Sequence, residues 1–228
     1  SRTTVRQALA ELLNEGLIRK EKGRGTFVAE PKIRERLVER LRGFYEDMVA
    51  QGLRPETKVL EQGVVAAPRA IASWLEIDPG APVIRTRRLR MINGEPLLVV
   101  VSYVPEALCP DLVQDDLEKH SLYWTLENKY GLRLARGRRY IEAVAATEQE
   151  AQLLGVPRGA PLVYLRSVTY LTDGRPVEYY EAKHRGDRSR FEVELIRMTE
   201  GVAETAPAGG AWARAPRAWG RTGCDPRA

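Results

Sequence analysis

The chain has 228 residues, 29% of them charged, and a formal net charge of +5. This length fits one large or two modest domains, and no apolar run approaches the roughly 20 residues that cross a bilayer. Only Cys109 and Cys224 are present, without Cys-x-x-Cys spacing, which indicates neither a disulfide framework nor a zinc site. We expect a cytoplasmic protein without membrane span, metal or cofactor. The positive charge is compatible with a nucleic-acid partner but does not select one.

The first 29 residues predict a helix followed by a small β-hairpin. Apolar residues recur at spacings of three and four, typical of one buried helix face: Val5, Leu9, Leu12 and Leu13. Ser1 is a candidate N-cap, and Gly16 is expected to end the helix. Two short strands, 17–22 and 26–28, flank the glycine-rich tip 23–25. A unit this small needs partners to fold, and because the chain does not begin with Met we expect sequence to precede it.

Residues 30–35, which include Pro31, predict a linker, and residues 36–200 predict a second domain of mixed α+β type. It is expected to open with an amphipathic helix that carries Phe44 and Met48 and ends at Gly52. Short strands then alternate with short helices; the strands are expected at 83–91, 96–104, 140–146, 161–171 and 176–184. From residue 201 the composition changes to Ala, Gly, Pro and Arg without periodicity, which predicts a disordered tail.

An internal repeat is visible within the second domain. Residues 72–83 resemble residues 151–162, and each copy continues as strand, turn and strand. The two turns contain Asn93-Gly94 and Asp173-Gly174, pairs that tolerate positive φ in tight hairpins. Each copy therefore predicts one helix plus one antiparallel hairpin. Two such units related by a pseudo-twofold axis are expected to form a single domain with a ligand cleft near the axis.

The exposed side of the first helix carries side chains suited to DNA. Arginine can bind guanine edges or phosphates, and threonine and glutamine can bond bases or backbone. The residues expected to contact DNA on this helix are Arg2, Thr3, Thr4, Arg6 and Gln7. At the hairpin tip, Gly25 allows close approach of the backbone while Arg24 can enter a minor groove. Periodicity alone also fits the solvated face of an ordinary amphipathic helix.

A family resemblance decides between these alternatives. The run Ser1-Arg2-Thr3-Thr4-Val5-Arg6-Gln7-Ala8-Leu9, with Glu15-Gly16-Leu17-Ile18 and then Gly23-Arg24-Gly25-Thr26-Phe27-Val28, resembles the recognition helix and wing of GntR-superfamily regulators. In that family two further helices precede this segment. The resemblance therefore implies a partial winged helix-turn-helix that binds double-stranded operator DNA.

Residues 36–200 resemble the UTRA effector-binding domain of the HutC-type GntR branch, whose fold is similar to chorismate lyase. The resemblance rests on the order of short motifs, among them Arg85-Thr86-Arg87-Arg88-Leu89-Arg90, Gly94-Glu95-Pro96-Leu97, Ser102-Tyr103-Val104-Pro105, Ser121-Leu122-Tyr123, Pro176-Val177-Glu178-Tyr179-Tyr180 and Arg185-Gly186-Asp187-Arg188. It implies an α+β fold in which a chorismate-lyase-like sensor domain with an antiparallel sheet follows the partial winged helix-turn-helix.

The same resemblance implies an effector site. Arg88 and Arg90 correspond to arginines that bind an anionic group in sugar-phosphate-sensing relatives, and residues i and i+2 of a strand share one face. Ser121 is expected to offer a hydroxyl to that anion, and Glu178 to hold a ligand hydroxyl or amine. For each of them, a surface ion pair or a helix cap is the alternative.

Two residues depart from the pattern of sugar-phosphate-sensing relatives. Val100 replaces a glutamate, and His184 replaces a tyrosine. One wall of the pocket is therefore expected to be less polar, and His184 adds a contact sensitive to pH. A sugar phosphate, a carboxylate and a phosphonate all remain open as the anionic effector.

These observations predict a homodimeric transcription regulator, a repressor by default, that a small anionic effector modulates. One alternative is a ligand-sensing and dimerisation module that does not bind DNA by itself. A second is an enzyme related to chorismate lyase, although the sequence shows no Ser-His-Asp order, metal cluster or phosphate-cradling glycine loop.

Overall fold

The computed structural model describes residues 1–14, 17–21, 23–28, 32–36 and 44–193. The expected helix end at Gly16 and the tail 201–228 lie outside the described residues. Within them, no helix is both long and apolar enough to span a membrane.

The N-terminal unit consists of the predicted helix and hairpin. In α1 (Arg2–Asn14) the Thr4 N–H donates to Ser1 Oγ at 3.3 Å, which confirms Ser1 as its cap. β1 (Ile18–Glu21) and β2 (Gly25–Val28) pair antiparallel around the glycine-rich tip.

The prediction of a buried apolar face on α1 is wrong for the described residues. Val5 is 59% exposed and Leu13 is 37% exposed, whereas Leu9 and Leu12 are half-buried. The physical reason is size, because one helix and a hairpin of two four-residue strands offer too little apolar surface to cover this face.

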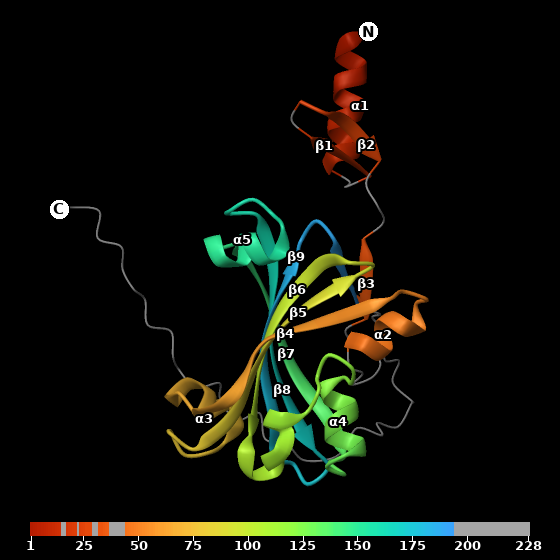
Figure 1. The fold of residues 1–228 in the computed structure, drawn as a ribbon. Coiled ribbons are helices and arrows are strands. Elements are labelled where there is room, and N and C mark those ends of the chain that lie inside the picture. Colours follow the sequence, from red (N-terminus) through yellow and green to blue (C-terminus); the bar gives the residue numbers. More distant parts are fainter. Residues whose placement is uncertain (15–16, 22, 29–31, 37–43, 194–228) are drawn as a thin grey trace, which may run out of the picture. The chain divides into compact units, whose positions relative to one another are not determined.

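The second part of the chain is built on a six-stranded antiparallel sheet, so the α+β prediction is confirmed (Figure 1). From edge to edge its strands are β4 (Pro55–Ala66), β5 (Pro82–Ile92), β6 (Glu95–Pro105), β9 (Pro176–Arg185), β8 (Pro161–Leu171) and β7 (Leu134–Ala145). A separate parallel pair joins β3 (Ile33–Arg36) to β10 (Ser189–Glu192). β3 falls across the boundary expected between linker and second domain.

Helices cover both faces of the sheet (Figure 1). On one face lie α3 (Arg69–Leu75) and α5 (Glu148–Leu154). On the other lie α2 (Phe44–Ala50) and α4 (Leu122–Asn128), together with the 3-10 turns η1 (Glu106–Leu108) and η2 (Pro110–Gln114). Alternate strand residues face the two layers, because side chains of a strand point to opposite faces in turn.

The internal repeat is confirmed. β4, α3 and β5 begin at residues 55, 69 and 82, and β7, α5 and β8 begin at residues 134, 148 and 161, a constant offset of 79 residues. Matching bonds close the two loops: the N–H of Ala67 donates to Ala81 O at 2.9 Å, and that of Ala146 donates to Ala160 O at 2.8 Å. The sheet order places the two copies on either side of the β6–β9 junction, so the sheet has a pseudo-twofold axis there.

The two hairpin turns differ in backbone conformation and in length. Asn93 and Gly94 both have positive φ, 51° and 77°, which confirms a tight two-residue turn. In the second turn only Gly174 has positive φ, 89°, so the expectation is wrong for Asp173. This turn is longer, since β8 ends at Leu171 and β9 begins at Pro176. Because Arg90 pairs with Leu98 and Thr169 pairs with Glu178, the offset between matching residues is 80 after the turns.

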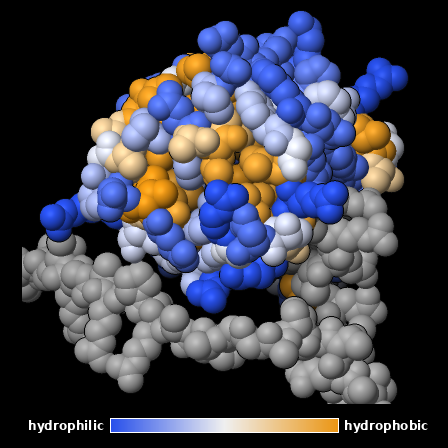
Figure 2. All heavy atoms as spheres, turned by 90° about the horizontal axis from the view of Figure 1, so that it is seen from below, coloured by the Kyte–Doolittle hydropathy of each residue, from blue (hydrophilic) through white to orange (hydrophobic). Residues whose placement is uncertain are grey.

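Surface hydrophobicity on the described part is broken up. On the face seen in Figure 2, apolar residues lie in small groups between charged ones. The large apolar side chains that are exposed in this domain come from several elements: Tyr45, Val49, Val64, Val65, Trp124, Ile141 and Val193.

Candidate effector-binding site

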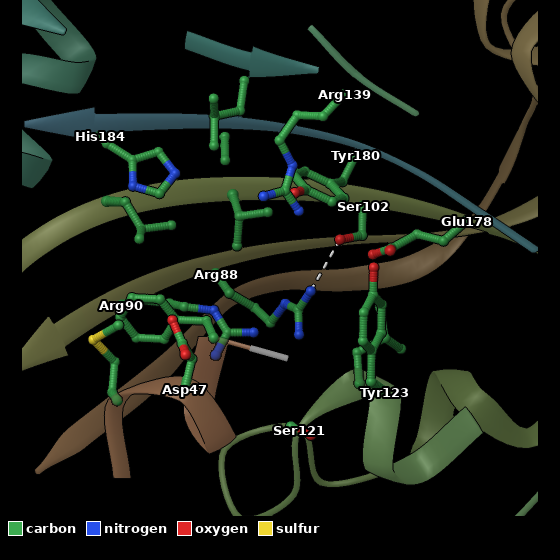
Figure 3. A pocket seen from close by; sticks show the side chains of 17 residues that line it. Asp47, Arg88, Arg90, Ser102, Ser121, Tyr123, Arg139, Glu178, Tyr180 and His184 are labelled. Carbon is green, nitrogen blue, oxygen red and sulfur yellow. Dashed lines mark hydrogen bonds between the residues drawn. The ribbon is translucent and has the colours of Figure 1, made fainter. Parts of the chain in front are cut away.

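A cavity lies on the sheet face that α2 and α4 cover, over the junction of β6 and β9 (Figure 3). Its atom-free space is about 760 Å³, including the opening to solvent. All six residues that the sequence places in the effector site line it: Arg88, Val100, Arg90, Ser121, Glu178 and His184. They come from β5, β6, β9 and the start of α4, so folding brings together residues up to 96 positions apart, from Arg88 to His184.

Arg88 is a deeply buried charge of the site, with 2% of its surface exposed. Its Nη2 donates to Ser102 Oγ at 2.9 Å, whereas Nε and Nη1 have no hydrogen-bond partner among the described residues. Burial lowers the pKa of Arg88, and the nearby Glu178 carboxylate opposes that shift. A buried guanidinium with two nitrogens unused as donors is costly unless an anion completes its hydrogen bonds.

Arg90 lies two residues further along β5 and faces the same cavity (Figure 3). Its Nη1 donates to Thr57 Oγ1 at 3.4 Å, and its guanidinium lies 5.1 Å from the centre of the Phe44 ring. Burial and the adjacent charge of Arg88 lower the pKa of Arg90 to about 9. Arg90 thus remains protonated at neutral pH, and the pair forms a concentrated positive charge.

Glu178 faces these arginines from β9 and is 2% exposed. Its Oε2 has no hydrogen-bond partner among the described residues. Burial raises the pKa of Glu178, while the charge of Arg88 acts in the opposite direction. Nearby, the hydroxyl of Tyr123 bonds Thr169 Oγ1 at 2.8 Å, and burial raises the pKa of Tyr123 well above its usual value. The Glu178 carboxylate is therefore a buried hydrogen-bond acceptor that faces the same cavity as the two arginines.

Ser121 is the N-cap of α4, as expected from the sequence, and its Oγ accepts a hydrogen bond from the Trp124 N–H at 3.1 Å. Its hydroxyl donates to Oε1 of Glu46 on α2. The cap alternative considered for Ser121 is thus realised, and Ser121 nevertheless lines the cavity.

Val100 and His184 form part of a less polar wall. Val100 packs in an apolar cluster with Leu98, Leu165 and Ala182. The imidazole of His184 meets the Phe191 ring edge-on at 5.1 Å. The cavity therefore combines a cationic end with an apolar side.

Sequence reasoning missed most of the remaining lining side chains: Phe44, Asp47, Met48, Leu98, Ser102, Leu122, Tyr123, Arg139, Leu165, Tyr180 and Ala182. Some carried a usable signal, because Tyr180 and Ala182 continue the two-residue period that runs from Glu178 to His184. Arg139 comes from β7 and carried none, since its approach to the site depends on the sheet order.

The residues expected to contact DNA are all exposed: Arg2, Thr3, Thr4, Arg6 and Gln7 on α1, and Arg24 and Gly25 at the hairpin tip. Thr4 Oγ1 lies 3.1 Å from Ser1 Oγ, so its hydroxyl is engaged with the cap. Gly25 has a φ of 125°, in the region that favours glycine. The effector residues lie in a cavity, whereas the DNA residues lie on an open surface.

Comparison with known proteins identifies the family. A family model described as the UTRA domain matches residues 50–190. The HTH-type transcriptional repressor NagR of Bacillus subtilis is 34% identical over 199 residues, which cover 87% of this chain and 81% of NagR. The histidine utilization repressor of Pseudomonas putida is 32% identical over 192 residues, covering 84% of this chain and 76% of that protein.

Structural similarity agrees with this assignment. The crystal structure of PhnF from Mycobacterium smegmatis matches with a TM-score of 0.70 and 31% identity, covering 87% of this chain and 86% of PhnF. The named relatives are regulators rather than enzymes. The chain therefore belongs to the UTRA-containing, HutC-type branch of the GntR family, DNA-binding transcription regulators with an effector-binding domain.

Proposed function

We propose that this regulator is a cytoplasmic, homodimeric repressor that binds a small anionic effector through Arg88 and Arg90. The observation that carries the proposal is the buried Arg88 guanidinium, which faces the cavity with two nitrogens, Nε and Nη1, unpaired among the described residues. A phosphate, phosphonate or carboxylate supplies a negative charge to balance the guanidinium and oxygens that accept hydrogen bonds from its unpaired nitrogens.

The rest of the cavity restricts the effector further. Glu178 requires a ligand hydroxyl or amine that can donate to its unpaired Oε2. Leu98, Val100 and Leu165 favour an apolar portion between the two polar ends. A sugar phosphate, a carboxylate and a phosphonate all satisfy the cationic end, and the apolar side favours those with a less polar middle.

The proposed mechanism couples the cavity to DNA. A homodimer presents two copies of α1 to a pseudo-palindromic operator, with base and phosphate contacts from Arg2, Thr3, Arg6 and Gln7. Effector binding changes the hinge around residues 29–36, so the spacing of the two α1 helices no longer fits the half-sites. DNA and effector affinities are then reciprocally linked.

A thermal-shift screen against sugar phosphates, urocanate-like acids, alkylphosphonates and fatty acids tests the effector class. A ligand that binds the folded state raises the melting temperature, and we expect a shift that Arg88→Met abolishes.

Operator binding is tested separately, by the fluorescence anisotropy of operator fragments selected from genomic DNA. Arg6→Ala should weaken operator binding while leaving the thermal shift unchanged; an unchanged operator affinity would remove Arg6 from the DNA-contacting set.

A further inference from the structure

The hydroxyl of Ser121 is already committed within the protein. A serine hydroxyl has one proton to donate, and here that proton is donated to Glu46 Oε1. The same oxygen accepts the Trp124 N–H as the cap of α4. Ser121 lines the cavity, but it cannot donate to an anion there while Glu46 holds its proton.

Glu46 is also a negative charge beside the arginine pair. Its half-buried carboxylate has one oxygen on Ser121, and its other oxygen, Oε2, is buried without a partner among the described residues. The Glu46 charge favours the protonated form of Arg90. Part of the positive potential of the site is therefore offset by a carboxylate of the protein itself.

Helix α2, which carries Glu46, is part of the cavity wall. Met48 is fully buried in the cluster with Leu98 and Val100, and the ring of Phe44 lies under the Arg90 guanidinium. Among the described residues, α2 is the next helix along the chain after α1. A change at Glu46 therefore acts on a helix that forms part of the cavity wall.

We infer that Glu46 is a built-in competitor of the effector: the anionic group of the effector and the Glu46 carboxylate compete for the Ser121 hydroxyl proton, and effector binding releases α2 from α4. This inference rests on the proposed anion site. The contact joins residues 75 positions apart in the sequence, so its loss removes a link between two helices that are distant along the chain.

Sulfate titrations at constant ionic strength test the competition. Glu46→Gln removes the competing charge and should tighten sulfate binding roughly tenfold, the effect of one charge-assisted hydrogen bond. Ser121→Ala should weaken sulfate binding. Glu127→Gln, at an exposed position of α4, removes an equal charge from a residue that does not line the cavity and should change the affinity little.

The double variant Glu46→Gln/Ser121→Ala distinguishes an effect of Glu46 through the Ser121 hydroxyl from an effect of its charge alone. If Glu46 acts through the hydroxyl, most of the gain from Glu46→Gln disappears in the Ser121→Ala background. A gain of equal size in both backgrounds would overturn the hydroxyl competition, as would a Glu46→Gln variant that binds sulfate no more tightly than the unaltered protein.

Hydrogen exchange tests the release of α2 without any substitution. Sulfate should slow exchange in β5 around Arg88 and speed exchange in residues 44–50. Protection of β5 with unchanged exchange in α2 would leave the anion site intact and overturn the inference about Glu46. If neither the unaltered protein nor Glu46→Gln binds sulfate or any other anion of the thermal-shift screen, the proposed function fails as well.

Discussion

The two halves of the sensor domain share a backbone but differ in chemistry. At the offset of 79 residues, Arg88 and Arg90 of β5 match Ser167 and Thr169 of β8. Beyond the turns, at an offset of 80, Leu98 of β6 matches Glu178 of β9. All of these positions except Leu98 carry buried polar or charged side chains. At these matched positions the first half thus supplies two arginines, and the second half supplies two hydroxyls and one carboxylate.

This difference shows how a symmetric scaffold makes a directional site. The pseudo-twofold axis passes near the paired residues Val101 and Glu181, and a symmetric sequence would place equal charge on both sides of it. Because the two arginines of β5 match Ser167 and Thr169 in the second half, charge is unevenly placed about the axis, although Arg139 of β7 also lines the cavity. A ligand is therefore expected to bind in a single orientation.

The largest expected effect on anion affinity comes from substituting Arg88, in comparison with Ser167 at the matching position. Arg88→Met should weaken sulfate binding by roughly 100-fold, because it removes a buried charge and a charge-assisted hydrogen bond. Ser167→Ala, at the matching position in the second half, should change the affinity less than about threefold. Calorimetric titration of both variants checks this, and equal losses would show that the anion does not distinguish the halves.

A smaller effect concerns pH. Burial raises the pKa of Glu178, and its protonation removes a negative charge from the site. Sulfate binding should therefore strengthen as pH falls through that raised pKa and weaken as pH rises above it. Glu178→Gln should bind severalfold more tightly with a flatter profile. His184→Gln, a substitution at another lining residue of β9, is the control; a Glu178→Gln profile as steep as the original would assign the pH dependence to another group.

The helices of the two halves are capped differently, which predicts a stability difference. Thr147 and Glu150 form a capping box at α5, whereas Pro68 at the matching end of α3 makes no side-chain cap bond. Thr147→Ala should lower the free energy of unfolding by about 1 kcal/mol, and Thr147→Ser should retain most of it. Urea denaturation measures both, and an equal loss for Ser and Ala would exclude the hydroxyl as the cause.

The smallest effect lies at the other ends of these helices. Glu76 and Gly155 match at the offset of 79, and both are left-handed, with φ of 54° and 65°. Since only glycine adopts this region without strain, Glu76→Gly should stabilise the protein by about 0.5 kcal/mol and Gly155→Ala should destabilise it by about 1 kcal/mol. The space around Gly155 is open, so a steric contact would not explain a loss of stability in Gly155→Ala. Thermal denaturation of the pair checks the opposite signs.

The sequence predicts the central strands better than the edge strands. β5, β6, β8 and β9 lie within one residue of their expected bounds, because buried strands give long apolar or alternating runs. β4 was not predicted and only the second half of β7 was. Both are edge strands with polar stretches, such as Arg136-Gly137-Arg138-Arg139, that carry no strand pattern.

The site shows the same limit. Residues on one strand, such as Arg88 and Arg90, could be paired from the two-residue period and the family resemblance. Glu46 could not, because its contact with Ser121 depends on how α2 packs across the sheet. The burial expected for Val5 failed for a related reason: periodicity predicts which side of a helix is apolar, but not whether anything covers it.

The central claim is that an anion held by Arg88 controls DNA binding. Operator affinity measured by fluorescence anisotropy, with and without the anion that gives the largest thermal shift, tests it most directly in the unaltered protein and in Arg88→Met. We expect the anion to lower operator affinity at least about fivefold in the unaltered protein, the lower end of typical allosteric coupling, and to have no effect on Arg88→Met. An operator affinity that the bound anion leaves unchanged, or lowers equally in both proteins, would contradict the account.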